Sequence, residues 1–370
     1  MPDLGVRLQL LIGTTLPVPA PYDVVDALLE VEVTNNDERR DGFQLTFSLG
    51  KKRTARDYLL LESGLLDPPN RVSILVIIQG LPQVLINGMI TRHDFTASNG
   101  PGQSRLLVKG EDTGLQLDLK SKRDVHRNLS DSGIVQKIML NYPEFTPVIT
   151  PTTDMPTEVQ RVVPQHETDL AFIQKLARRN SFVFFTEPTP LPGTSIAYWG
   201  PRDRPGLLPQ RAITQNMGSE TNVDQISFGF DGLGPVAPQV TISDPITKLD
   251  LPIPVPSLLQ APLSTQPTTP LRQQPVEDTA NLDPIQAALR ALMVASDSAD
   301  AVDGTGELDA ASYGGALRSR QQVGVRGTGV THDGLYYVKT VTHRIKRGEY
   351  KQSFELKRGG RGALSPLVNP

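Results

Sequence analysis

Three carboxylates in neighbouring stretches of the sequence are the side chains best suited to acid–base chemistry. Glu111 and Asp112 stand near the end of a predicted strand, and Asp131 stands near the start of a predicted helix. Glycoside hydrolysis would need two such carboxyl groups roughly 5–9 Å apart in a cleft. Aromatic residues, which line sugar-cleaving grooves, make up only 5% of the chain, with Trp199 as the single tryptophan. Solvated loop carboxylates are therefore the favoured interpretation, and we assign no catalytic residue.

Histidines offer a second route to chemistry, as metal ligands. None of the five histidines stands at the i, i+4 spacing of a helical zinc site, and the sequence has no His-Glu-x-x-His motif. His332 and His343 flank a predicted strand and could form a metal pair, although surface or hydrogen-bonded strand histidines are the simpler interpretation. The absence of cysteine excludes thiolate metal sites, disulfides and cysteine nucleophiles. We expect neither a metal nor a cofactor.

Glycine-rich and basic stretches could instead hold phosphate. The glycines of 324–329 lack the spacing of a phosphate loop and a following helix, so they predict a tight connection between strands. Net charge is −3 and the isoelectric point is about 6.0, so we expect no specific nucleic-acid site. A local basic cluster predicts a solvated loop or helix start, with contact to an acidic protein surface as the alternative; it comprises Lys120, Lys122, Arg123, His126 and Arg127.

Size and composition limit the fold that must position these residues. A chain of 370 residues exceeds the roughly 250–300 residues that one core supports, so two or more domains are expected. The 32 prolines and 31 glycines favour a β-rich protein over a helical bundle. There is no signal-peptide pattern, and no apolar run is long enough to span a bilayer. These features predict assembly in the cytoplasm.

Residues 1–118 have the pattern of a first β-barrel. Apolar residues alternate with polar ones in several short runs, which places one side of each strand in a core. The clearest sets are Val6, Leu8 and Leu10, then Leu29, Val31 and Val33, then Phe43, Leu45 and Phe47. Their spacing and polar turns predict a closed or nearly closed antiparallel barrel.

Residues 119–205 predict a small α+β domain. Ser130 or Ser132 could cap a helix over 133–141, and Thr168 is a good cap for a second helix that ends near Asn180. Predicted strands follow at 182–185 and 195–199.

Residues 206–370 predict a second barrel, with an insertion over about 245–320. Ten prolines fall between Pro235 and Pro275, a composition typical of extended polyproline-like chain rather than of a central strand. A helix is predicted from Asp283 to Ala295, with Asp283 as its cap, and a loop over 296–315. Closing strands are predicted at 322–326, 334–342 and 349–357, the last two joined by a turn with Arg347 and Gly348.

Several segments resemble the hub proteins of contractile injection systems: the phage late-control D proteins, the T4-type baseplate hub and the N-terminal hub part of VgrG spike proteins. Val84–Thr91 and Leu106–Asp118 resemble two successive hub strands. Gln165–Ala177 resembles the family's Glu-Thr/Ser-Asp helix, and Val323–Arg358 resembles the closing strands of its second barrel. The likeness extends over most of the chain, apart from the proline-rich insertion.

This resemblance implies a structural protein rather than an enzyme. Two tube-like barrels in each of three copies would mate a six-fold tail tube with a three-fold spike. The implied partners are two further copies of the chain, a tail tube protein, a separate spike protein and other baseplate proteins, within a virion tail or injection particle. The alternatives are a tail-tip glycan or peptidoglycan hydrolase, which would use Glu111, Asp112 and Asp131, and a receptor-binding β-protein.

Overall fold

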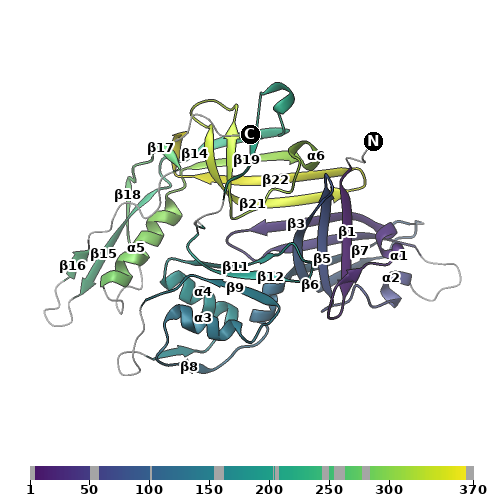
Figure 1. Ribbon diagram of the computed structural model, residues 1–370, viewed down its shortest axis with the longest axis horizontal. Helices are drawn as coiled ribbons and strands as arrows, with labels where there is room; N and C mark the ends of the chain where they lie inside the picture. The colour runs from purple at the N-terminus through teal and green to yellow at the C-terminus, as the bar shows by residue number, and fades with distance from the viewer. Residues whose placement is uncertain are drawn as a thin grey trace.

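The chain folds into two parts rich in strands and a middle part of mixed helices and strands (Figure 1). This computed structural model describes residues 5–50, 58–100, 102–153, 162–202, 204, 208–243, 250–253, 263–276 and 284–363. Strands predominate and most of them pair antiparallel, so the prediction of a β-rich α+β fold is confirmed. No helix in these ranges is long and apolar enough to cross a membrane.

Residues 7–112 form the first β-rich part, whose strands lie in the order β3-β4-β7-β6-β5-β1-β2, all antiparallel. The predicted alternation holds, and Val31, Leu45 and Phe47 are fully buried. Leu29 is an exception, because a register shift between Leu28 and Glu30 leaves it 37% exposed. The elements are β1 (Arg7–Gly13), β2 (Val18–Pro19), α1 (Tyr22–Ala27), β3 (Leu28–Asn36), β4 (Gly42–Leu49), α2 (Leu59–Glu62), β5 (Arg71–Ile78), β6 (Leu81–Thr96) and β7 (Ser104–Asp112).

One position in this sheet has room only for glycine, because an aromatic ring packs directly against its backbone. A Cβ on Gly110 would lie 2.2 Å from Cζ of Phe43 and 2.3 Å from the carbonyl oxygen of Met89. Gly110→Ala is therefore expected to lower the free energy of unfolding by about 1–3 kcal/mol through overpacking, measured by urea unfolding. Gly42→Ala, on the neighbouring strand, is the matched control, because its new Cβ would meet its nearest atom at 3.5 Å. Equal losses in the two variants would contradict this explanation.

Residues 113–200 form the middle part, in which α3 and α4 cover a small sheet of order β11-β12-β9 (Figure 1). The hydroxyl of Ser130 caps α3 and that of Thr168 caps α4, as predicted. Trp199 is fully buried in the core between helices and sheet. The elements are η1 (Thr113–Asp118), β8 (Asp124–His126), α3 (Asp131–Met139), β9 (Phe145–Ile149), β10 (Val163–Gln165), α4 (Asp169–Arg179), β11 (Val183–Pro188) and β12 (Ser195–Gly200).

Residues 210–363 form the second β-rich part and an arm. β19 lies between β14 and β22, and β22 forms the predicted hairpin with β21. Its core fully buries Val323, Tyr336 and Leu356. The elements are β13 (Gln210–Thr214), η2 (Gly218–Glu220), β14 (Gln225–Phe230), β15 (Val236–Ser243), β16 (Asp250–Ile253), β17 (Ser264–Pro267), β18 (Arg272–Pro275), α5 (Pro284–Ser298), β19 (Val302–Asp309), α6 (Ala310–Tyr313), β20 (Gln322–Arg326), β21 (Gly334–Lys346), β22 (Glu349–Arg358) and β23 (Gly360–Ala363).

The proline-rich stretch falls only partly within the described residues. There it forms short strands: β15 pairs with β16 and β18 in the arm beside α5, and β17 pairs with β23 (Figure 1). The predicted helix is observed as α5, with Pro284 in its first turn. Its expected cap, Asp283, lies outside the described residues.

The loop predicted over 296–315 is wrong, because this stretch contains the end of α5, all of β19 and α6. The glycines that suggested a loop face aromatic rings of neighbouring strands. A Cβ on Gly306 would lie 2.5 Å from Cζ of Phe354, and one on Gly304 would lie 3.2 Å from Cε1 of Phe228. Glycine stands in this strand because the rings occupy the space of its missing side chain.

One 13-stranded sheet joins the two β-rich parts. β21 pairs with β22 along one edge and with β3 along the other, so Thr342 stands opposite both Ser353 and Thr34 (Figure 1). Because β4 and β21 occupy both edges of β3, no edge remains to receive β1. The pairing of the described strands stays open at β1 and β2, and the predicted closed barrels are not confirmed.

Candidate functional site

The three predicted carboxylates do not converge. Glu111 is partly exposed and pairs with Arg40, with 2.8 Å between Oε2 and Nε. Asp112, the next residue, points inward and is 6% exposed. Asp131 begins α3, where the side-chain amide of Asn180 donates to its Oδ2 over 2.7 Å. Because each carboxylate is held by a different partner, the arrangement gives no support to glycoside hydrolysis.

His332 and His343 have different surroundings. His332 stacks on Phe228 with ring centroids 4.7 Å apart. His343 is fully buried, and its Nδ1 lies 2.9 Å from the hydroxyl of Tyr350. Burial, and then the charge of Arg318, lowers the pKa of His343 to about 3, so the ring is neutral at physiological pH. Within the described part of the chain, no three His, Asp or Glu side chains gather as a metal site.

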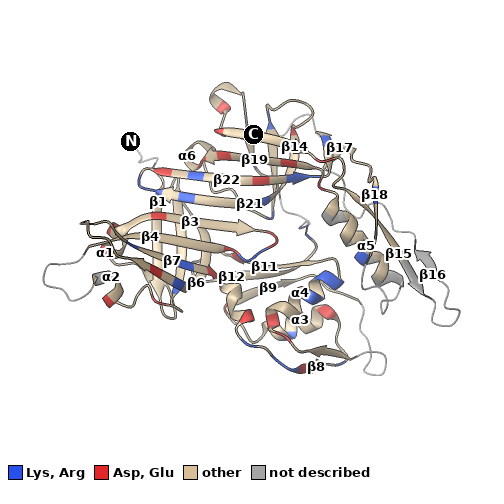
Figure 2. Ribbon diagram, turned by 180° about the vertical axis from the view of Figure 1, so that it is seen from behind, with Lys and Arg blue, Asp and Glu red and all other residues tan. Residues whose placement is uncertain are grey.

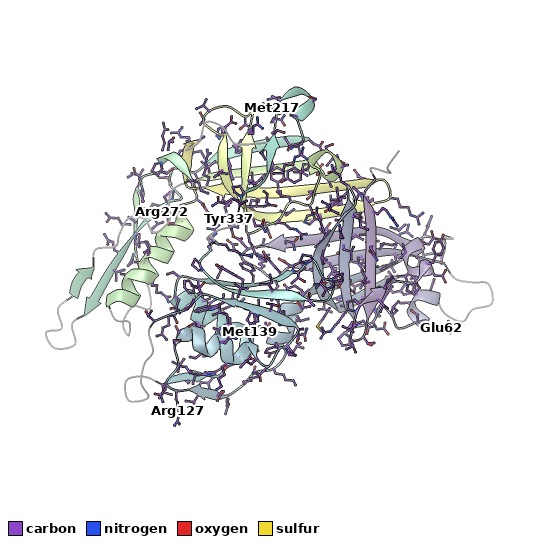
Figure 3. All side chains as sticks on the ribbon, in the orientation of Figure 1. Glu62, Arg127, Met139, Met217, Arg272 and Tyr337 are labelled. Carbon is purple, nitrogen blue, oxygen red and sulfur yellow. The ribbon has the colours of Figure 1, made fainter. Side chains whose placement is uncertain are left out.

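The predicted basic cluster separates into two members with partners inside the middle part and three exposed members. Lys122 pairs with the buried carboxylate of Asp169 at the start of α4. His126 is 3% exposed and stacks on Phe172 in the core of the middle part. These two side chains hold the middle part together rather than form a surface. The exposed members are Lys120, Arg123 and Arg127, the last of which lies at the outer end of the middle part (Figure 3).

The glycines of 324–329 form the end of β20 and the following turn. Oδ1 of Asp333 closes this turn by accepting from the backbone N–H and the hydroxyl of Thr328, over 2.8 and 2.9 Å. A protein carboxylate thus occupies the position that an anion would take in a phosphate cradle. The interpretation as a strand connection agrees with this geometry.

A buried cluster of charges lies where the three parts meet; we call it the three-way junction and define it by Asp41, Asp112, Phe185, Thr186 and Arg320. Arg320, 3% exposed, forks onto Asp41 with distances of 2.6 Å (Nη2–Oδ1) and 3.0 Å (Nη1–Oδ2). Its guanidinium also lies 4.6 Å over the ring of Phe185. Arg320 adopts a left-handed backbone with φ of 62°, a cost of about 1–2 kcal/mol that the bidentate pair offsets.

Asp112 completes the three-way junction. Its Oδ2 accepts from the backbone N–H of Asp41 over 2.8 Å, and its Oδ1 accepts from the hydroxyl of Thr186 over 2.7 Å. Burial, and then the charge of Asp41, raises the pKa of Asp112 to about 6, against the opposing effects of Thr186, Gly114 and Arg320. Two buried carboxylates therefore share one buried cation.

Arg202, in the linker after β12, forms ion pairs with both β-rich parts. Its guanidinium lies 3.3 Å from a carboxylate oxygen of Asp37 in the first part and 3.2 Å from one of Asp300 in the second. It also lies 4.2 Å over the ring of Tyr337, which Figure 3 shows where β21 approaches the middle part. The linker therefore fixes the β-rich parts to each other as well as continuing the chain.

The outward face of the joined sheet is polar across both β-rich parts. Figure 2 shows positive and negative residues interspersed along β3, β19, β21 and β22. Arg344 crosses the join between β21 and β3, with 3.4 Å to Glu30 and 3.2 Å to Glu32. Because the charges pair with one another, this face is hydrophilic without being a basic groove for nucleic acid.

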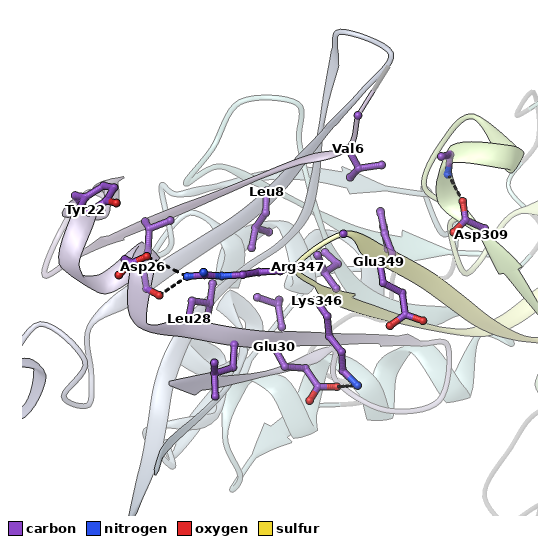
Figure 4. A pocket seen from close by; sticks show the side chains of 18 residues that line it. Val6, Leu8, Tyr22, Asp26, Leu28, Glu30, Asp309, Lys346, Arg347 and Glu349 are labelled. Atoms are coloured by element: carbon purple, nitrogen blue, oxygen red, sulfur yellow. Dashed lines mark hydrogen bonds and ion pairs between the residues drawn. The ribbon is translucent and has the colours of Figure 1, made fainter. Parts of the chain in front are cut away.

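A cavity of about 550 Å³ lies between β1 and β3, on the side where the first β-rich part stays open. Its walls are largely apolar, with Leu8 on one side and Leu28 on the other (Figure 4). Arg347, from the β21–β22 turn, reaches across its mouth to Oδ1 of Asp26 over 3.0 Å.

Solved structures of tail proteins share this fold from end to end. A tail protein from Neisseria meningitidis MC58 has a TM-score of 0.65 at 13% identity, covering 97% of this chain and 98% of that one. The 43 kDa tail protein of prophage MuSo2 from Shewanella oneidensis has 0.65 at 11% identity, covering 95% and 99%. The E. coli c3393 protein, a component of the type VI secretion system, has 0.55 at 14% identity, covering 98% and 80%. The chain has a tail-protein fold.

Comparison of the sequence with family models gives a match to only part of the chain. A family model described as the Alg8 N-terminal domain matches residues 22–191, which is less than half of the chain. No curated protein matches the sequence. The matched range contains the β3–β4 turn with Asp41, and Asp112 and Thr186 of the three-way junction.

Sequence reasoning missed most of the three-way junction. Asp112 was selected only as a candidate acid, while Asp41 and Arg320 were not selected, because a buried arginine in a polar loop has no local signature. One usable signal exists for the linker: Arg202 and Arg204 are closely flanked by Pro201 and Pro205 at the predicted domain boundary. Charged residues on a proline-stiffened linker are well placed to pair with the parts on either side.

Proposed function

We propose that the chain is a structural baseplate hub subunit of a contractile phage tail or a phage-tail-like injection system. Three copies form a ring that adapts a six-fold tail tube to a three-fold spike. The observation that carries this proposal is the pairing of β3 with β21, which joins two β-rich parts of one chain in one sheet. Two tube-like modules per chain become six modules in a trimer, the number that a six-fold tube requires.

The proposed domains are 1–118, 119–205 and 206–370, the last with an insertion over about 245–320. Separate hydrophobic clusters support this division, since Val31, Trp199 and Tyr336 each belong to a different one. In the ring, domains 1–118 and 206–370 each supply one tube-like barrel module, and the polar outer face lines the lumen. Such a face lets cargo or DNA pass because its charges are already paired.

The proposed partners are two copies of this chain, a tail tube protein, a separate spike protein and other baseplate proteins. The end-to-end fold likeness to tail proteins supports a place in such a particle. The role is non-enzymatic, since a ring needs shape and edges rather than a catalytic cleft. A hydrolase would need Glu111, Asp112 and Asp131 together, and their partners lie apart.

Mass measurement of the purified chain tests the ring directly. Light scattering is expected to give three times the 40.4 kDa of one chain, and negative-stain images are expected to show a ring of the same particles. Labelled chain should then appear at the junction of tube and spike in assembled particles. A strictly monomeric chain that is absent from such particles would overturn the proposal.

A further inference from the structure

A crevice of about 240 Å³ lies beside the three-way junction and takes its walls from all three parts. The first part contributes 82–85, at the start of β6, and the middle part contributes 187–190, at the end of β11. The second part contributes 318–321, the loop before β20. Pro82, Pro188 and Pro190 stand in these walls, and proline fixes the backbone and carries no N–H donor. The crevice is therefore a preformed space rather than a loose gap.

The positively charged guanidinium of Arg318 lines this crevice and has no carboxylate partner among the described residues. Its Nη1 donates to the backbone carbonyl of Val84 over 2.6 Å, and it forms no ion pair with any described carboxylate. Burial lowers the pKa of its guanidinium, opposed by Tyr350, Glu187 and Asp41. A partly buried cation of this kind gains free energy when an anion reaches it.

The two carboxylates in the same walls are already neutralised. Arg320 holds Asp41, with its nearest contact at 2.6 Å, and Arg204 holds Glu187, also at 2.6 Å. Among the charged residues that line the crevice, Arg318 is the one without an ion pair to a described carboxylate. A monoanion therefore suits the crevice better than a dianion such as phosphate, which would also face Asp41 and Glu187.

Two further donors lack acceptors at this place. Nε of Arg320 is buried and has no hydrogen-bond partner, although the other guanidinium nitrogens of this residue are paired. Ser319 is 4% exposed, and its hydroxyl makes no hydrogen bond to another described residue. The unpaired buried N–H of Arg320 is costly, and an incoming oxygen acceptor would satisfy it.

We propose that this crevice is a binding site for one carboxylate group. A carboxylate offers two oxygens with about four acceptor positions, enough for the guanidinium of Arg318, the Nε–H of Arg320 and the Ser319 hydroxyl together. The group belongs either to an Asp or Glu side chain of a partner protein or to a free small carboxylate. This inference is independent of the ring, because a monomeric chain would have the same crevice.

Calorimetric titration with blocked amino acids tests the chemistry. N-acetyl-glutamate N-methylamide carries one side-chain carboxylate and is expected to bind with a dissociation constant on the order of 1 mM, as its size allows. The glutamine counterpart has the same shape without the charge and is expected to bind at least about tenfold more weakly. Equal binding of the two compounds by the natural chain would overturn the proposal.

Substitutions in the crevice test whether the blocked glutamate binds there, and a control substitution outside the crevice tests for misfolding. Arg318→Gln keeps a polar side chain with an N–H donor but removes the charge, so glutamate-compound binding is expected to fall at least about tenfold. Ser319→Ala, which leaves all guanidinium contacts in place, is expected to weaken it about three- to tenfold. Arg211→Gln is the matched control, because Arg211 also donates to a carbonyl, that of Tyr313 over 2.9 Å, but lies outside the crevice. Unchanged binding in both Arg318→Gln and Ser319→Ala would overturn the site.

Acetate and propionate, which are both monoanions, distinguish the two sources of the carboxylate. If the ligand is a partner's side chain, the blocked glutamate is expected to bind more tightly than either free acid. If it is a free small carboxylate, propionate or acetate is expected to bind more tightly by about tenfold. Either order supports a carboxylate site, and loss of all three signals in the natural chain contradicts it.

Discussion

Arg320→Met is expected to lower the free energy of unfolding by about 3–5 kcal/mol, because it removes one partner of a buried ion pair. Methionine can still pack against Phe185, but it cannot neutralise Asp41, which is 1% exposed. Asp112 would then stand beside Asp41 with no cation between them. One carboxylate must take up a proton or water must enter the three-way junction, and both lower stability. Urea unfolding at neutral pH measures the loss.

Arg344→Met is the matched control for this experiment. Arg344 also pairs with two carboxylates, but its side chain is 51% exposed, so its loss is expected to lower the free energy of unfolding by less than about 1 kcal/mol. Adding Asp41→Asn to Arg320→Met is expected to restore part of the lost stability, because the unpaired charge disappears. An Arg320→Met variant no less stable than Arg344→Met would refute the role assigned to Arg320.

Trp199 gives this variant a second readout. It is the single tryptophan and lies in the core of the middle part, so its fluorescence reports that part alone. Circular dichroism reports mainly the strands of the two β-rich parts. If the three-way junction couples the parts, the two unfolding transitions coincide in the natural chain and separate in Arg320→Met.

Local features of the fold were predictable because their causes are local. The caps at Ser130 and Thr168 follow from hydroxyls that stand just before an apolar helical stripe. The β21–β22 hairpin follows from two alternating runs around Gly348. Such signals lie within a few residues of one another, so a single sequence carries them.

Contacts between distant residues were not predictable in this way. Thr34 and Thr342 share a hydrogen bond at the join of the β-rich parts, although 308 residues separate them. Arg320 and Asp41 stand 279 residues apart. Either edge of β3 could have received a partner, and closure by β1 would satisfy the same alternating pattern. The local pattern fixes which residues face the core but not which strand lies beside them.

Glycine misled the prediction for β19 for a related reason. Gly304 and Gly306 read as loop residues because glycine is rare in strands. Glycine stands at these two positions because the rings of Phe228 in β14 and Phe354 in β22 occupy the space where a side chain would lie. The aromatic partners are remote in sequence, so only the assembled sheet explains the small residues.

Two buried groups are expected to act oppositely on stability as the pH falls. The folded-state pKa of His343 is lowered to about 3, while the unfolded chain takes up this proton near pH 6.5. Acidification below 6.5 therefore favours the unfolded chain, by about 3 kcal/mol at pH 4.5. The folded-state pKa of Asp112 is raised to about 6. The folded chain takes up this proton first, so Asp112 favours the folded state as pH falls from 7 to 4.5, by about 2 kcal/mol.

Single substitutions are expected to separate these two contributions. His343→Gln cannot take up a proton, so between pH 7 and 4.5 its stability is expected to improve relative to the natural chain by about 3 kcal/mol. Asp112→Asn is expected to change in the other direction, losing about 2 kcal/mol relative to the natural chain over the same range. Urea unfolding at several pH values measures both differences. Stability profiles of both variants that run parallel to that of the natural chain would show that neither buried group titrates as its surroundings require. Profiles that diverge in opposite directions are expected because burial, the larger cause of both shifts, disfavours the charged form of each group. That form is the protonated one for His343 and the deprotonated one for Asp112.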